Sequence, residues 1–194
     1  FEAWPAVERL VVVTREDRLK AVAEIAAAHG VTKPTTVVAG GGERHLSVWN
    51  GLQAAEAAEG THVAVHDAAR PLITPEAILG CLELARKHGG AACAAPVVDT
   101  LKQANGAGLI TGSISREGVW AMQTPQIFLA SMLIEAYKPI LREGALVTDE
   151  VSAVERLGIQ VAVYPNPQPN FKITHRADLL LARALLAASG GEAP

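Results

Sequence analysis

The chain has 194 residues, with 17 Lys and Arg against 20 Asp and Glu, so its formal charge is −3. That balance argues against a nucleic-acid partner, whose interface shows as clustered Lys and Arg on a basic domain. With 49% hydrophobic and 19% charged residues, the chain can build a core and is not disordered. No apolar run approaches the roughly 20 residues that span a bilayer, and no signal-peptide pattern opens the chain. We therefore expect a cytoplasmic protein without a membrane partner.

Strand-like and helix-like periods alternate over the first half of the chain. The expected strands cover 10–13, 35–39, 62–66 and 91–98, and the expected helices cover 17–29, a segment capped by Ser47, and 75–87. Thr74-Pro75-Glu76 is a good helix start, with a capping hydroxyl, a proline at the first helical position and an acid in the first turn. The fourth strand is nearly all apolar, as in a strand covered on both faces. This order predicts a mostly parallel, Rossmann-like α/β sheet.

The alternation breaks after the fourth strand. Residues 99–119 read as a polar hairpin, with a turn at Asn105-Gly106-Ala107-Gly108 and a return strand over 109–115. A polar hairpin does not fit a core covered on both sides. We therefore expect a protruding arm that contacts another chain, and the alternative is an idle surface hairpin.

The second half returns to core elements. The predicted segments are a polar loop over 123–126, helices over 128–141, 148–158 (capped by Thr148) and 175–188, and strands over 159–164 and 171–174. We find no repeat and no linker, so we expect one domain over 1–194 with an arm. Cys81 and Cys93 have neither metal-type nor disulfide-framework spacing and are expected to be buried thiols.

Ligands of open α/β sheets bind beyond the carboxyl ends of the strands. Asp67, directly after the third strand, can hold Mg²⁺, which prefers carboxylates together with phosphate oxygens. Arg70 suits bidentate phosphate recognition. The alternatives are an aspartate that caps a turn beside a solvated arginine, and a structural strand-end role for His66. Gly40-Gly41-Gly42 either lets a ligand approach the backbone closely or is ordinary turn punctuation.

Other hydroxyl and cationic residues lie at turns and element ends, where each alone is uninformative. They are Thr100, Thr124, Thr148, Arg116 and Lys172. Together with one acidic residue, they suit a phosphorylated substrate and a metal-bound nucleotide. They do not suit acyl transfer or redox chemistry.

Six sequence blocks then resemble a known family in order and spacing. They are Gly-Gly-x-x-Arg-x-x-Ser-Val ending at Val48, His66-Asp67-Ala68-Ala69-Arg70-Pro71, Pro96 to Lys102, Trp120 to Phe128, Thr148-Asp149-Glu150, and Asn170 to Thr174 with Asp178-Leu179. This series resembles the 2-C-methyl-D-erythritol 4-phosphate cytidylyltransferases over nearly the whole chain, from about Val11 to Leu185. Phe171 stands where isoleucine is more usual, and Gly42 stands where some relatives carry a polar side chain.

The resemblance implies a magnesium-dependent nucleotidyltransferase that joins CTP and methylerythritol phosphate and releases pyrophosphate. It implies that Asp67 contacts metal, nucleotide and substrate. It also implies nucleotide binding by Gly41, Gly42, Ser47 and Ala68, substrate binding by Arg70, Thr100, Thr124 and Thr148, and catalysis by Arg116 and Lys172. A homodimer through the arm also follows from the resemblance.

The resemblance implies an opening strand and a glycine-rich triphosphate loop, whose residues cannot be named because this sequence begins at Phe1. If the protein begins at Phe1, we expect it to be inactive, and normal turnover of the chain alone would refute this. Two alternatives remain open at this point. One is a cytidylyltransferase for another polyol phosphate, such as ribitol 5-phosphate, and the other is a non-catalytic nucleotide-binding subunit.

Overall fold

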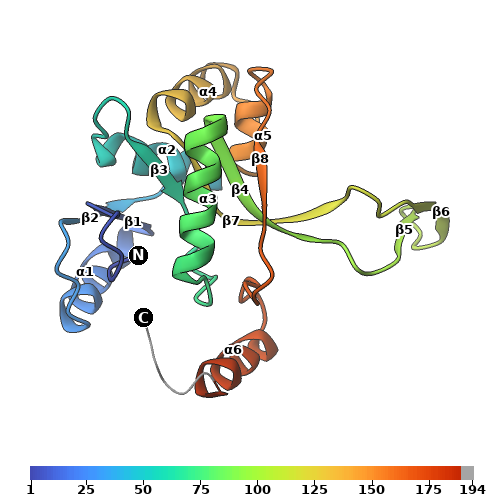
Figure 1. The fold of residues 1–194 in the computed structure, drawn as a ribbon, viewed down its shortest axis with the longest axis horizontal. Coiled ribbons are helices and arrows are strands. Elements are labelled where there is room, and N and C mark those ends of the chain that lie inside the picture. The colour runs from blue at the N-terminus through green and yellow to red at the C-terminus, as the bar shows by residue number, and fades with distance from the viewer. Residues whose placement is uncertain (189–194) are drawn as a thin grey trace.

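The computed structural model describes residues 1–188, and residues 189–194 of the predicted domain lie outside the described part. The strands are β1 (Leu10–Thr14), β2 (Thr35–Ala39), β3 (His62–Val65), β4 (Gly90–Pro96), β5 (Leu101–Ala104), β6 (Ile110–Ile114), β7 (Trp120–Leu129) and β8 (Ala162–Pro165). The helices are the 3₁₀ turn η1 (Glu16–Arg18) and α1 (Leu19–Ala28), α2 (Arg44–Ala55), α3 (Pro75–His88), α4 (Ala130–Glu143), α5 (Glu150–Glu155) and α6 (Arg176–Ala188). Figure 1 shows their arrangement.

The central sheet has the order β3-β7-β4-β8, and a separate parallel pair is formed by β1 and β2. β3 and β4 both run antiparallel to β7 and hence parallel to each other, and β8 is parallel to β4. The predicted mostly parallel α/β sheet is therefore confirmed, with β7 as its one antiparallel member.

The interpretation of residues 123–126 as a loop is wrong, because they lie in the middle of β7. Polar side chains are tolerated there because they are hydrogen-bonded. The Gln126 amide donates to Asp149 Oδ2 at 3.0 Å, and its Oε1 accepts the backbone N–H groups of Glu150 and Val151, each at 3.0 Å. A buried amide with these partners does not carry the cost of lost hydration.

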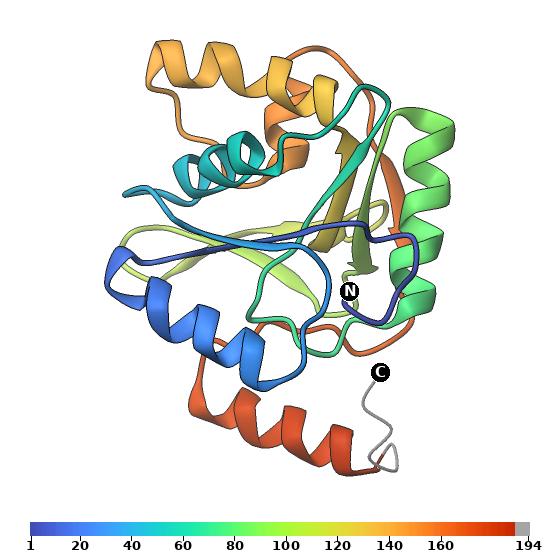
Figure 2. The ribbon, with the colours of Figure 1, turned by 90° about the vertical axis from the view of Figure 1, so that its left-hand side faces the viewer.

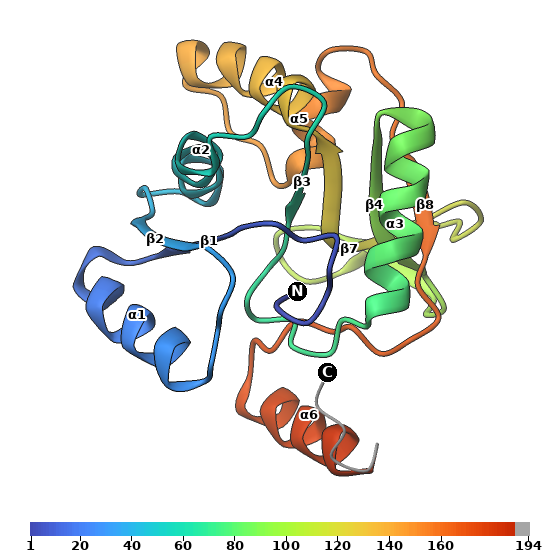
Figure 3. The ribbon, with the colours of Figure 1, turned by 60° about the vertical axis from the view of Figure 1, so that its left-hand side comes forward.

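Helices cover both faces of β7. Phe128 packs with Leu52 of α2 and with α4 and α5, whereas the next residue back, Ile127, packs with α3 and β4. Successive side chains of a strand point to opposite faces, so these two neighbours lie in two different cores. Figure 3 shows α3 apart from α2, α4 and α5, with β7 between them. Cys81 and Cys93 are buried free thiols in the α3 core, as predicted.

α3 begins and ends where the sequence predicts. The Thr74 side chain accepts the Ala77 N–H, Pro75 occupies the first turn, and Gly89 ends the helix with a φ of +84°. Two other predicted caps are wrong. Glu43 is the N-cap of α2, so Ser47 lies inside the helix, and Asp149 caps α5 in place of Thr148, accepting the Ser152 N–H at 2.9 Å.

The arm consists of β5 and β6, which pair antiparallel and extend away from the central sheet (Figure 1). Asn105 Oδ1 accepts the N–H groups of Ala107 and Leu109, and Gly108 adopts a φ of +77°. The predicted turn over 105–108 is therefore present, and the hairpin lies within 99–119.

The chain after β8 departs from the prediction at one point. Residues 171–174 form no strand but an irregular segment that leads into α6. α6 stands apart from the central sheet (Figure 2), and Ala182 is its one buried residue. No helix within residues 1–188 combines the length and the apolar character needed to cross a membrane.

Candidate active site

The carboxylate of Asp67 lies among three positively charged side chains. Asp67 Oδ1 is 3.4 Å from Nη2 of Arg44, and Oδ2 is 3.1 Å from Nζ of Lys172 and 3.6 Å from Nε of Arg70. These residues come from the start of α2, from the loop after β3 and from the irregular segment after β8. The carboxyl end of β3 is therefore a meeting point of chain segments distant in sequence, as expected for an open α/β sheet.

The environment of Asp67 keeps it ionised. Burial raises the pKa of the Asp67 carboxyl, but the hydrogen bond from Lys172 and the charges of Arg44 and Arg70 outweigh burial, so the pKa lies below its ordinary value. The Asp67 side chain is only 16% exposed. Glu150 Oε1, 2.7 Å from Nη1 of Arg44, adds a second negative charge, so three cations against two carboxylates leave one net positive charge, which suits an anionic ligand such as a phosphate.

A chain of hydrogen bonds holds the backbone of Asp67. Its N–H donates to Thr124 Oγ1 at 3.0 Å, the Thr124 hydroxyl lies 3.0 Å from His66 Nδ1, and His66 Nε2 lies 3.0 Å from the carbonyl oxygen of Arg70. A carbonyl can only accept, so Nε2 carries a hydrogen. Burial lowers the pKa of His66, so the ring is neutral and Nδ1 accepts from Thr124. Both ring nitrogens are thus used within the protein, which favours the structural interpretation of His66.

Hydrogen bonds also join the Lys172 segment to the Asp67 loop. The N–H of Ile173 donates to the carbonyl of Ala69 at 2.8 Å, and Arg70 Nη1 donates to the carbonyl of Asn170 at 2.8 Å. Lys172 therefore reaches Asp67 because the backbone on both sides of it is held, while its own side chain is 44% exposed.

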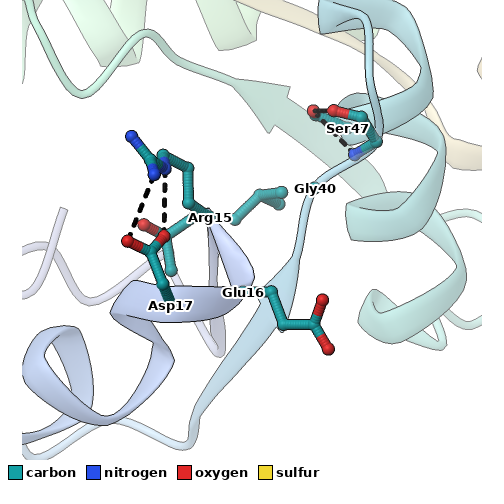
Figure 4. Close-up of a pocket in the computed structure, with 8 residues that line it drawn as sticks. Arg15, Glu16, Asp17, Gly40 and Ser47 are labelled. Atoms are coloured by element: carbon teal, nitrogen blue, oxygen red, sulfur yellow. Dashed lines mark hydrogen bonds and ion pairs between the residues drawn. The ribbon is translucent and has the colours of Figure 1, made fainter.

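A separate cavity of about 910 Å³ opens where β1 and β2 end (Figure 4). Gly40, Gly41 and Ser47 lie on one side of it, and Arg15 and Asp17 on another. The Ser47 hydroxyl accepts the Gly41 N–H at 3.1 Å. A Cβ at position 41 would overlap Leu46, and one at position 40 would come within 2.6 Å of Ser47 Oγ, so glycine lets the loop lie this close to α2. Glycine at these two positions therefore serves close packing against α2, and the approach of a ligand to this backbone stays a prediction.

Comparison with known proteins gives a consistent result. The family model described as 2-C-methyl-D-erythritol 4-phosphate cytidylyltransferase matches residues 1–188. The chain belongs to this family.

Two relatives bear the same name. The one from Geotalea uraniireducens is 41% identical over 99% of this chain and 83% of its own length, and the one from Symbiobacterium thermophilum is 39% identical over 96% and 77%. The crystal structure of the 2-C-methyl-D-erythritol 4-phosphate cytidylyltransferase from Thermus thermophilus is 30% identical, with a TM-score of 0.75 over 93% of this chain and 98% of that one.

The cytidylyltransferase family implies a set of site residues, and this chain brings part of that set together. Asp67, Arg70, Lys172 and Thr124 form one cluster, whereas Gly41 and Ser47 share the cavity of Figure 4. Thr124 is 4% exposed, and its hydroxyl is hydrogen-bonded to Asp67 and His66. Its observed contacts therefore favour a role in positioning Asp67 over direct substrate binding.

The other residues that the family resemblance implies make no bond to Asp67 within residues 1–188. Ala68 and Gly42 are exposed and adjoin the two regions in sequence. Thr100 and Arg116 are exposed in the arm, where Arg116 donates to the Val98 carbonyl. Thr148 is exposed as well, and its hydroxyl lies 3.2 Å from Ser152 Oγ.

The sequence does not single out four residues of the candidate site. Arg44 and Glu150 are both part of the recognised blocks, so a signal was present, but nothing in the sequence pairs them. Arg15 and Asp17 line the cavity directly after β1. Because ligands of open α/β sheets bind beyond the carboxyl ends of the strands, their position after a strand is the signal that could have identified them.

Proposed function

We propose that the protein transfers a cytidylyl group from CTP to 2-C-methyl-D-erythritol 4-phosphate, giving 4-diphosphocytidyl-2-C-methyl-D-erythritol and pyrophosphate in non-mevalonate isoprenoid biosynthesis. The observation that carries this proposal is the Asp67 carboxylate beside Arg44, Arg70 and Lys172 at the carboxyl end of β3. Two highly charged anions must meet in such a reaction, and the cluster supplies the positive charge that lets them do so.

The reaction is an in-line displacement. A phosphate oxygen of the acceptor attacks the α-phosphorus of CTP, a new P–O bond forms, and the bond to the bridging oxygen breaks as pyrophosphate leaves. No protein nucleophile is required, so positioning and charge neutralisation dominate. Lys172 is suited to neutralise the charge of an incoming phosphate. Its side chain is 44% exposed, so it can leave Asp67 for an incoming phosphate oxygen.

A divalent cation, Mg²⁺, is part of the proposal, and Asp67 would hold it. Within residues 1–188 no three His, Cys, Asp or Glu side chains gather into a cage. A lone carboxylate nevertheless fits, because Mg²⁺ is commonly held by one or two carboxylates together with substrate phosphates. When bound, the ion neutralises phosphate charge and orients the reacting group. The protein's part is to keep Asp67 ionised, which the three cations do.

The nucleotide would occupy the cavity beside Gly41 and Ser47. Its volume of about 910 Å³ falls in the range of pockets that take a ligand of nucleotide size. The acceptor phosphate would then face Lys172 and Arg70.

We include a homodimer formed through the arm. Leu109 and Ile110 are 66% and 69% exposed there, and such exposed apolar side chains suit contact with another chain. Arg116 lies in the same arm with no bond to its own Asp67 within residues 1–188, so it would serve the partner's site. Ile110→Glu should shift sedimentation from dimer to monomer, whereas Ile25→Glu, on α1, should not. A dimer that survives Ile110→Glu would contradict this arrangement.

The test of the proposed function uses the protein as its gene encodes it, with CTP, Mg²⁺ and each acceptor in turn. We expect pyrophosphate release with methylerythritol phosphate and a much lower rate with ribitol 5-phosphate. A faster reaction with ribitol 5-phosphate would overturn the assigned acceptor. Calorimetric binding of CTP without pyrophosphate release from any acceptor would overturn catalysis and leave a nucleotide-binding subunit.

A further inference from the structure

A buried ion pair lies directly behind Asp67. Glu150, the first residue of α5, has a fully buried side chain, and both of its oxygens are bonded by the guanidinium of Arg44. Nη1 is 2.7 Å from Oε1, and Nη2 is 3.0 Å from Oε2. This two-point geometry fixes the guanidinium plane, which a single contact would leave free to turn.

Other elements hold Glu150 in place. The hydroxyl of Tyr137, a fully buried residue of α4, donates to Glu150 Oε1 at 3.2 Å, and the Glu150 N–H donates to Gln126 of β7 at 3.0 Å. Burial and the charge of Glu150 raise the pKa of Tyr137, so its hydroxyl stays a donor. Burial lowers the pKa of Arg44, but its bond to Glu150 more than offsets this, so Arg44 stays charged. The pair is therefore a fixed point of the fold.

The same Arg44 nitrogen that bonds Glu150 Oε2 also reaches Asp67. Nη2 is 3.4 Å from Asp67 Oδ1, whereas Lys172 and Arg70 both lie on the Oδ2 side. The cations around Asp67 are thus of two kinds. Lys172 is exposed and can leave, but moving Arg44 would strand a buried carboxylate without its countercharge, which proteins avoid.

We propose that Arg44, fixed by Glu150, is a positioning residue that sets the orientation of the Asp67 carboxylate. It holds Oδ1 in one place throughout the reaction, so that Oδ2 stays directed to the ligand side when Lys172 leaves. This inference rests on the proposed function and adds to it two separate roles: Arg44 stays bonded to Asp67, whereas Lys172 exchanges Asp67 for the substrate.

The test compares Arg44→Lys with the parent protein in pyrophosphate release from CTP and methylerythritol phosphate, and in Mn²⁺–CTP binding by calorimetry. Lysine keeps the positive charge but cannot bond both Glu150 oxygens and Asp67 together. We expect a loss of about tenfold or more in kcat/KM, weaker Mn²⁺–CTP binding, and a melting temperature lowered by only a few degrees, because one bond to the buried Glu150 is lost. Arg156→Lys is the matched control, because Arg156 Nη2 bonds Glu143 Oε2 at 2.6 Å on the exposed surface.

A double-mutant cycle separates positioning from a general structural role. If Arg44 acts through Asp67, Arg44→Lys should add little to the loss already caused by Asp67→Asn. Full activity and binding in Arg44→Lys, or losses that multiply fully in the double variant, would overturn the inference. If Arg44→Lys does not fold, Tyr137→Phe, which keeps the ion pair, should show a smaller, few-fold loss, and no loss would overturn it. An inactive parent protein would instead refute the proposed function.

Discussion

Lys172→Ala separates the catalytic value of the lysine from its structural value. Its Nζ lies 3.1 Å from Asp67 Oδ2, but the side chain is 44% exposed, so the pair contributes at most about 1 kcal/mol to folding. A group that stabilises the charge developing in the transition state contributes more free energy to catalysis than this surface ion pair contributes to folding. Loss of one such preorganised group costs about 2.7–4 kcal/mol, or about 10²–10³-fold in kcat. We therefore expect a folded and nearly inactive variant.

The assay is pyrophosphate release at saturating CTP and methylerythritol phosphate, together with a urea unfolding curve. The control is Lys138→Ala, because Lys138 is 57% exposed and its Nζ lies 2.5 Å from Glu135 Oε1 on α4. The control removes an ion pair of the same kind without touching the site. A Lys172→Ala protein that keeps near-parental kcat would refute the reasoning, as would a variant that loses several kcal/mol of stability.

Two further predictions concern stability. A Cβ at Gly90 would overlap the Phe128 ring, so Gly90→Ala should lower the free energy of unfolding by about 1–3 kcal/mol in urea, while Gly106→Ala, in open space, should not. Equal effects would contradict this packing. Burial and the charge of Arg86 lower the pKa of His62. Because the unfolded chain binds this proton more readily than the folded chain, acidification below about pH 6.5 destabilises the fold, and His62→Gln should reduce that loss of stability in pH-dependent melts. The pKa of His66 is lowered as well, so part of the stability loss on acidification should remain in His62→Gln. If the melting temperature of His62→Gln depends on pH as steeply as that of the parent, His62 does not contribute to the acid destabilisation.

The sequence predicts features that local rules determine. α3 is set by its own Thr74 cap and by Gly89, and Asp67 is found because it directly follows an apolar strand. Lys172 is predicted to be near Asp67 only through the resemblance, since the two are joined by backbone bonds such as that from Ile173 to Ala69. Such contacts between distant segments leave no local pattern.

β7 and the Arg44–Glu150 pair show where local reasoning fails. Gln126 looks like a loop residue because its partners, Asp149 and the start of α5, lie more than twenty positions away. Arg44 and Glu150 are 106 positions apart and look like two surface charges. The wrong caps have two other causes. Thr148 and Asp149 are both good capping residues, and local preference does not choose between neighbours. α2 begins after Glu43, whose side chain makes no capping bond, so the sequence carries no capping signal at its true start.

The most direct test of the account is the turnover of Asp67→Asn, which keeps the size of the side chain but removes its charge and replaces one accepting oxygen by a donating NH2 group. The account predicts that pyrophosphate release from CTP and methylerythritol phosphate falls by about 10²-fold or more while the protein stays folded. Glu135→Gln, which removes the charge of an exposed carboxylate on α4, should leave catalysis intact. Parental turnover in Asp67→Asn would contradict the claim that this carboxylate organises the reaction.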